Sequence, residues 1–373
     1  MAITCPHCGA EFDATLFQFG HRVRCHCGAE VEYPGSDLLA GHVVAQGKDK
    51  TISHEDRCVG CLLGTACGDI LGAAVEGWPA SAIHRQFGKL HDFLGGDRGF
   101  GCYTDDTQMT LALASSLVER GRVDAAHVSA KYAEFYEPWR GYGGTAHTVM
   151  QTLRSGADYR TTGRAQFQEG SFGNGGAMRI APVGLAYRHA APEVLHHAVE
   201  EALLCTHVHS EAIDAAFIQA MSVARAATSN DPAKFDAQGL LQALQQQSRT
   251  EVLRVKLTAL SDALPGEVGD EEVIETVGNG IRASEAVAAA LWAFLRYGKT
   301  PEECIIRAVG FGGDTDTIGA MAGAVVGALH GNSWIPARWF NNIENGVHGR
   351  DEIVALARRL AGLDIRSWEQ RGG

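Results

Sequence analysis

The chain has 373 residues, which is enough for one large domain with a small one appended. Its hydrophobic content of 45% and charged content of 20% are ordinary for a globular protein. The net charge of −12 argues against broad nucleic-acid binding, which depends on basic patches. The longest apolar runs, near residues 287–295 and 320–329, are too short or too interrupted by glycine to span a bilayer, and no signal peptide precedes them. We therefore expect a cytoplasmic protein without a membrane partner.

The first 34 residues are predicted to form a small, β-rich zinc ribbon. Two cysteine pairs, each followed by glycine, have the spacing that brings four thiolates to one tetrahedral Zn²⁺. So short a segment buries little apolar surface, so the metal would supply its stability. His7 or His26 are alternative ligands, and the competing interpretation is a tail that binds no metal. The predicted zinc ligands are Cys5, Cys8, Cys25 and Cys27.

Residues 35–55 are polar and are predicted to be a linker, and residues 56–373 a single all-α domain. Helical spacing of apolar residues is clearest at 108–120, 126–137, 193–204, 211–227, 282–295 and 318–329. The six later cysteines are interpreted as small buried hydrophobic residues. Cys58 and Cys61 also allow a second zinc site, but their setting favours packing within the first helix of this domain.

Two short acidic segments, each directly before an apolar helix, are the main candidates for chemistry. They read Thr-Asp-Asp-Thr at 104–107 and Asp-Thr-Asp-Thr at 314–317. One such segment alone is typical of an ordinary helix N-cap. Two of them offer the hard oxygen ligands that Mg²⁺ or Mn²⁺ prefers. If the two helix starts face each other, two divalent cations would offset the repulsion between their carboxylates.

Three further segments interrupt apolar helices with glycine and polar residues, at 68–76, 170–179 and 205–209. The glycines of 170–179 allow backbone amides to approach a phosphate closely, although a plain tight turn is the alternative. Phe172 within that segment suits stacking on a base better than a place in the core. His207 and His209 are equally compatible with ordinary core or surface positions.

These five segments, in this order, resemble the ADP-ribosylglycohydrolase superfamily from about residue 56 to the C-terminus. The resemblance implies a compact all-α fold with two Mg²⁺ (or Mn²⁺) that cleaves the glycosidic bond between ADP-ribose and an acceptor. It implies Glu76, Asp105 and Asp316 as catalytic residues, with Glu76 mobile. The implied metal ligands are Thr104, Asp105, Asp106, Asp314, Asp316 and Thr317. The implied substrate-binding residues are Gly143, Gly144, Phe167, Ser171, Phe172, Gly173, Asn174, His207 and Ile281.

Within the superfamily, residues 137–144 and 277–281 resemble the branch that acts on O-linked ADP-ribose, best known for ADP-ribosylserine. The expected partner is therefore an ADP-ribosylated protein or a small ADP-ribose conjugate. Hydrolysis of ADP-ribosylarginine is the alternative activity, and modified nucleic acid and O-acetyl-ADP-ribose are further candidate substrates. The alternative class is a catalytically silent ADP-ribose-binding module directed by the zinc ribbon, although the intact acidic set argues against silence. The zinc ribbon is a departure from the usual family architecture.

Overall fold

The computed structural model of the chain describes residues 52–96 and 98–367, together with four short strands nearer the N-terminus. The strands form two antiparallel pairs, β1 (Ala2–Thr4) with β2 (Glu11–Asp13) and β3 (Arg22–Arg24) with β4 (Glu30–Glu32). Cys5, Cys8, Cys25 and Cys27 lie outside the described residues, so the zinc ribbon and its metal stay a prediction.

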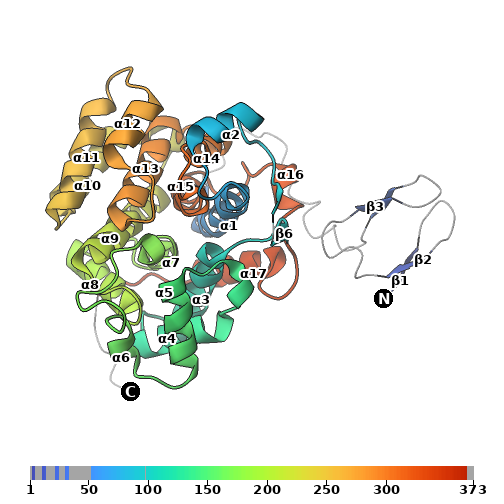
Figure 1. Ribbon diagram of the computed structural model, residues 1–373, viewed down its shortest axis with the longest axis horizontal. Helices are drawn as coiled ribbons and strands as arrows, with labels where there is room; N and C mark the ends of the chain where they lie inside the picture. Colours follow the sequence, from blue (N-terminus) through green and yellow to red (C-terminus); the bar gives the residue numbers. More distant parts are fainter. Residues whose placement is uncertain are drawn as a thin grey trace.

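The remainder is a compact helical domain, which confirms the predicted all-α class (Figure 1). Its helices are α1 (His54–Ala73), α2 (Ala80–Phe87), α3 (Asp105–Arg120), α4 (Ala125–Phe135), α5 (Gly144–Arg154), α6 (Tyr159–Thr162), α7 (Ala181–Ala186), α8 (Pro192–Leu203), α9 (Ser210–Ala227), α10 (Ala237–Gln247), α11 (Glu251–Ala263), α12 (Asp270–Val277), α13 (Ala283–Tyr297), α14 (Pro301–Gly310), α15 (Thr315–His330), α16 (Ala337–Phe340) and α17 (Arg350–Leu360). The six helices predicted from apolar spacing are α3, α4, α8, α9, α13 and α15. A short antiparallel pair of two-residue strands, β5 (Gly95–Gly96) and β6 (Gly99–Phe100), precedes α3.

Helix α1 begins at His54, two residues inside the predicted linker, because a capping box fixes its start. The Ser53 hydroxyl accepts a hydrogen bond from the Asp56 amide at 3.0 Å, and the Asp56 carboxylate accepts one from the Ser53 amide at 3.4 Å. Each bond satisfies an amide that has no partner within the helix.

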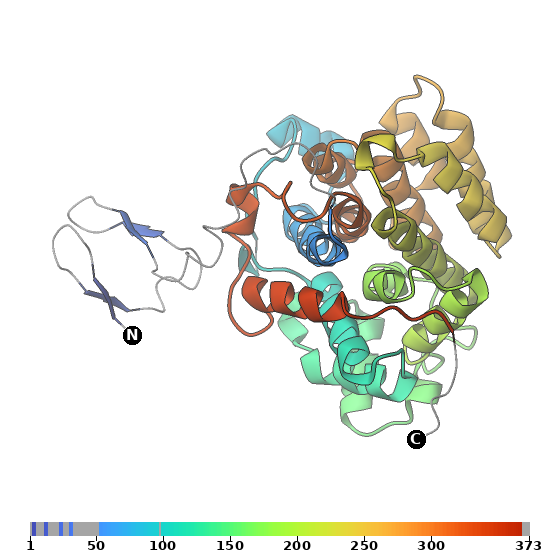
Figure 2. The same cartoon turned by 180° about the vertical axis from the view of Figure 1, so that it is seen from behind.

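Helices α1 and α15 lie side by side at the centre of the domain in both views (Figures 1 and 2). They meet along two rows of glycines, in which glycine recurs at every fourth residue of each helix. A Cβ at Gly64 would lie 2.2 Å from the Gly323 carbonyl oxygen, and one at Gly68 would lie 2.0 Å from that of Gly319. The backbones therefore touch directly. The facing glycines are Gly60, Gly64 and Gly68 on α1 with Gly319, Gly323 and Gly327 on α15 and Gly331 just after it, while Gly72 faces the backbone of Thr315 and Asp316.

Replacing Gly64 by alanine is expected to lower the free energy of unfolding by about 1–3 kcal/mol, the usual cost of overpacking. The roughly 1 kcal/mol that alanine gains over glycine within a helix offsets only part of the clash with the Gly323 backbone. Denaturant unfolding measures the change. Gly346→Ala is the control, because none of the residues that the structure describes would lie within 4 Å of its Cβ. An unchanged midpoint for Gly64→Ala would contradict the direct backbone contact.

The other helices surround this pair. Helices α9, α13 and α14 pack on α15, while α3 and α17 pack on α1. Helices α10–α13 form one corner of the domain and α4–α6 another (Figure 1). The six cysteines of the helical domain are all buried, as predicted, and Cys58 and Cys61 lie inside α1. No helix among the described residues is both long and apolar enough to cross a membrane.

Candidate functional site

The two acidic segments face each other, which is the condition on which a shared cation site depends. Thr104 is the N-cap of α3 and Asp314 the N-cap of α15. The carboxylates of Asp106 on α3 and Asp316 on α15 lie in one group of charges with Asp314. Asp106, Asp314 and Asp316 are all buried. The glycine contact between α1 and α15 positions one of these helix starts.

The other helix start is held by Asp69, which lies within α1 and is fully buried. Both of its carboxylate oxygens accept a hydrogen bond from the Thr104 amide at 3.0 Å. One of them also accepts bonds from the Thr107 amide at 3.0 Å and hydroxyl at 2.6 Å. Asp69 thus fixes the first turn of α3 against α1. No role for Asp69 is predicted from the sequence, although an aspartate beside Gly68 in an apolar helix is a visible sign of a buried polar contact.

Glu76 follows α1 and reaches the same cluster from the solvent side. One carboxylate oxygen from each of Glu76, Asp314 and Asp316 can be chosen so that all three lie within 4.8 Å of one another. A guanidinium nitrogen of Arg98 lies 3.7 Å from Glu76 Oε2. Arg98 is not among the site residues predicted from the sequence. Arg98 occupies space left by Gly141, whose Cβ would meet its guanidinium and whose φ of 94° favours glycine.

The convergence of carboxylates makes their ionisation unfavourable. Burial, and then the charge of Asp69, raise the pKa of Asp105 to about 7. Burial followed by the charges of Asp106 and Asp314 raises the pKa of Asp316 well above its usual range. Burial and then Asp314 also raise the pKa of Glu76. Bringing these carboxylates together in ionised form requires compensating positive charge.

The glycine-rich loop lies beside the cluster. The Asn174 side-chain amide donates a hydrogen bond to Asp314, and its backbone amide donates one to the Ile281 carbonyl at 2.9 Å. The Ala283 amide bonds to the Phe172 carbonyl at 3.0 Å, so the segments around Phe172 and Ile281 run together. Phe172 is 51% exposed and Ile281 is 73% exposed. These two predicted substrate residues thus form an open apolar edge next to the acidic cluster.

His207 is buried against this loop. A Cβ at Gly175 would lie 2.9 Å from His207 Cε1, and within the part of the chain that the structure describes His207 Nδ1 has no hydrogen-bond partner. Burial, and then the charge of Arg179, lower the pKa of His207 to about 3, so the imidazole is neutral at pH 7. A buried neutral ring with one free nitrogen is suited to contact a ligand.

The remaining predicted residues lie around the same loops. The Ser171 hydroxyl accepts a hydrogen bond from the Gly173 amide at 3.1 Å. Gly143 and Gly144 start α5, and a Cβ at either would have no neighbour within 4 Å among residues 52–96 and 98–367. Phe167 is half exposed, and its carbonyl accepts the Gly170 amide at 2.9 Å. No hydrogen bond among the described residues ties Phe167 to the acidic cluster itself.

Comparison with known proteins defines the class of this chain. The ADP-ribosylglycohydrolase family model matches residues 50–370, so the chain belongs to that family and is a hydrolase of it. A Homo sapiens relative named ADP-ribosylhydrolase ARH3 is 32% identical, and the alignment covers 81% of this chain and 92% of the relative. The Danio rerio relative of the same name is 34% identical, and the alignment covers 82% of this chain and 90% of the relative. A solved structure titled ADP-ribosylglycohydrolase-related protein complex aligns with a TM-score of 0.66 at 30% identity, covering 84% of this chain and 99% of its own.

Acid is expected to destabilise the protein in part through His207. Its pKa is about 3 in the fold against 6.5 ordinarily, so the unfolded chain binds more protons between these values. The stabilising contribution of the neutral ring is complete above pH 6.5 and falls by about 3 kcal/mol by pH 4. His207→Gln should therefore lose less stability than the wild type over this range, as measured by denaturant unfolding at each pH. The half-exposed His197 provides the control variant, His197→Gln. Parallel pH profiles for wild type and His207→Gln would contradict the buried neutral imidazole.

Proposed function

We propose that this protein is a metal-dependent hydrolase that cleaves the glycosidic bond between ADP-ribose and an oxygen acceptor, of the ADP-ribosylserine type. The proposal rests on one observation: the acidic starts of α3 and α15 face each other next to the open apolar edge formed by Phe172 and Ile281. The acidic cluster suits divalent cations, and the edge suits a purine base.

The residues fit two Mg²⁺ or Mn²⁺ ions. Asp106 Oδ1 is buried and has no hydrogen-bond partner among the described residues, which is costly unless a cation completes it. The donors are carboxylates and hydroxyls, the hard oxygen ligands that these ions prefer. When bound, the ions would orient the ribose hydroxyls and polarise the reacting centre. The residues that would hold them are Thr104, Asp105, Asp106, Asp314, Asp316 and Thr317.

Glu76 is the group that would move a proton at the scissile bond. Cleavage of a glycosidic bond passes through an oxocarbenium-like state and needs a carboxyl group to protonate the leaving oxygen or activate water. Burial and neighbouring charge raise the pKa of Glu76 toward the range useful for that exchange. Its position after α1, partly open to solvent and paired with Arg98, allows it to move.

The loops beside the cluster would bind the rest of ADP-ribose. Phe172 and Ile281 would enclose the adenine, with the Arg282 guanidinium 5.4 Å from the Phe172 ring on one side. Backbone amides at Ser171 and Gly143–Gly144, with Gly173, Asn174 and His207 lining the same loops, would contact the pyrophosphate and ribose. Phe167 would complete the adenine surroundings.

The acceptor follows from the resemblance of residues 137–144 and 277–281 to the O-linked branch. Peptides bearing ADP-ribose on serine or on arginine, incubated with the Mg²⁺-loaded protein, test it by the release of free ADP-ribose. Release from serine alone is expected. Release from arginine alone would overturn the acceptor and keep the class of reaction.

A further inference from the structure

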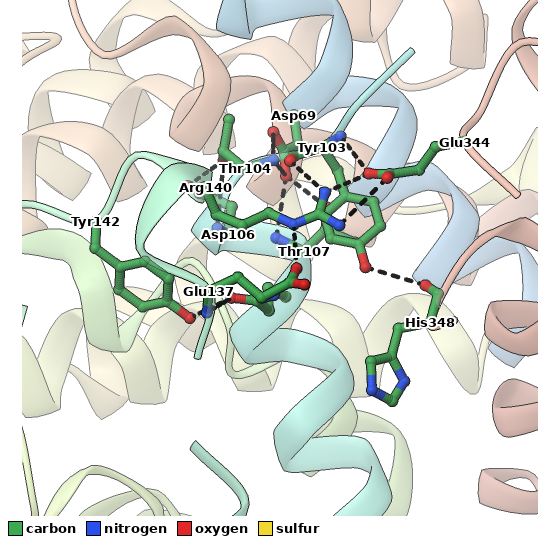
Figure 3. A network of polar contacts seen from close by, with 11 residues as sticks. Asp69, Tyr103, Thr104, Asp106, Thr107, Glu137, Arg140, Tyr142, Glu344 and His348 are labelled. Carbon is green, nitrogen blue, oxygen red and sulfur yellow. Dashed lines mark hydrogen bonds and ion pairs between the residues drawn. The ribbon is translucent and has the colours of Figure 1, made fainter. Parts of the chain in front are cut away.

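A buried arginine lies behind the acidic cluster. The Arg140 side chain is 4% exposed and stacks between the rings of Tyr103 and Trp139, 3.9 and 4.0 Å from their centroids. Its Nε donates to Glu137 Oε2 at 3.0 Å, and its two terminal nitrogens both donate to the carboxylate of Glu344. A planar guanidinium matches a carboxylate in this way with two parallel bonds. Figure 3 shows this pair beside the start of α3.

The pair holds one backbone residue from both sides. Arg140 Nη1 donates to the Tyr103 carbonyl at 2.9 Å, and Glu344 Oε1 accepts the Tyr103 amide at 3.0 Å. The Tyr103 hydroxyl bonds to the His348 carbonyl at 3.1 Å, from the same C-terminal segment as Glu344. Tyr103 thus has its amide, carbonyl and hydroxyl all fixed by other segments.

The next residue in the chain is Thr104, whose amide is held by Asp69. The backbone that leads into Asp105 and Asp106 is therefore anchored at two successive residues. One anchor is a buried carboxylate on α1, and the other is the Arg140–Glu344 pair. A turn held so tightly has little freedom in the direction in which the two aspartates project.

The same network reaches the turn beside the proposed pyrophosphate site. Glu137 Oε2 accepts Gln108 Nε2 at 2.9 Å, and Gln108 Oε1 accepts the Glu137 amide at 3.1 Å. Gln108 Oε1 also accepts the Tyr142 hydroxyl at 2.7 Å, and Tyr142 directly precedes Gly143. A chain of hydrogen bonds thus links the start of α3 to the start of α5 (Figure 3).

We propose that Arg140 and Glu344 are positioning residues that set the geometry of the metal-binding turn at Thr104–Asp106. The inference rests on the proposed function, since it assigns this network to the metal ligands of that site. A purely structural pair would change stability alone. A positioning pair changes the metal affinity of protein that is still folded.

Mn²⁺ titration of the full chain, followed by electron paramagnetic resonance, separates these roles. Glu344→Gln keeps an oxygen for the Tyr103 amide but removes the charge, and Arg140→Lys keeps a charge but loses the paired geometry. We expect each to weaken Mn²⁺ binding about 10-fold or more, as for other groups that orient metal ligands. Measurement below the unfolding temperature of each variant, checked by circular dichroism, keeps the comparison to folded protein.

Two exposed ion pairs supply matched controls, Glu251→Gln and Arg160→Lys, whose partners are Arg254 and Asp158. We expect both to bind Mn²⁺ as the wild type does, and kcat for ADP-ribose release to fall only in the Arg140 and Glu344 variants. Wild-type Mn²⁺ affinity in folded Glu344→Gln and Arg140→Lys would overturn the positioning role and leave the proposed function intact. A wild-type protein that neither binds Mn²⁺ nor releases ADP-ribose would overturn the proposed function, and the inference with it.

Discussion

Asp316→Asn is expected to lower kcat/KM for ADP-ribose release by about three orders of magnitude, because a bound metal ion contributes several kcal/mol to the transition state. The same change should weaken Mg²⁺ binding in calorimetry. Without metal, it should raise the Tm, since burial and the charges of Asp106 and Asp314 raise the pKa of Asp316 and make its ionised form costly.

Asp262→Asn is the matched control for this experiment, because that side chain is exposed and lies on α11. It should leave turnover, metal binding and Tm unchanged. If Asp316→Asn bound Mg²⁺ as tightly as the wild type, the assignment of Asp316 as a metal ligand would be wrong.

Glu76→Gln is expected to separate chemistry from metal binding. Removing a group that transfers a proton in the transition state typically costs between about 10²- and 10⁴-fold in rate. The amide keeps the shape of the side chain, and Asp314 and Asp316 remain, so metal affinity should change far less than kcat. Single-turnover release of ADP-ribose under metal saturation measures the rate, and calorimetry measures the affinity.

Glu267→Gln, at an exposed position, controls for loss of a surface charge and should be inert. Near-wild-type turnover of Glu76→Gln with metal bound would refute the proton-transfer role. An equal loss of turnover and metal affinity would instead make Glu76 chiefly a ligand.

Much of the fold can be predicted from the sequence because its helices are long and regular. Apolar spacing predicts α3, α4, α8, α9, α13 and α15 with ends within three residues of those observed. The exact starts depend on local hydrogen bonds, as the capping box at Ser53 illustrates. The four-residue glycine rows at 60–72 and 319–331 are also visible, but spacing within one helix does not reveal which partner it touches.

Part of the site can also be predicted from the sequence, because some of its residues form recognisable local patterns. Paired acidic helix starts signal their chemistry locally, and the exposed Phe172 and Ile281 occupy an edge that suits the predicted role. Arg98, Arg140 and Glu344 carry no such local signal. Each acts through a residue far away in the chain, as Glu344 does on Tyr103, so only the three-dimensional arrangement reveals them.

The most direct test of the proposed metal-dependent hydrolysis is ADP-ribose release from a serine-modified peptide by protein stripped with EDTA and then titrated with Mg²⁺. We expect no release from the stripped protein and full recovery as Mg²⁺ is added. Equal release with and without the metal would contradict the binuclear centre. ADP-ribose binding without any release from serine- and arginine-modified peptides alike at saturating Mg²⁺ would contradict catalysis itself.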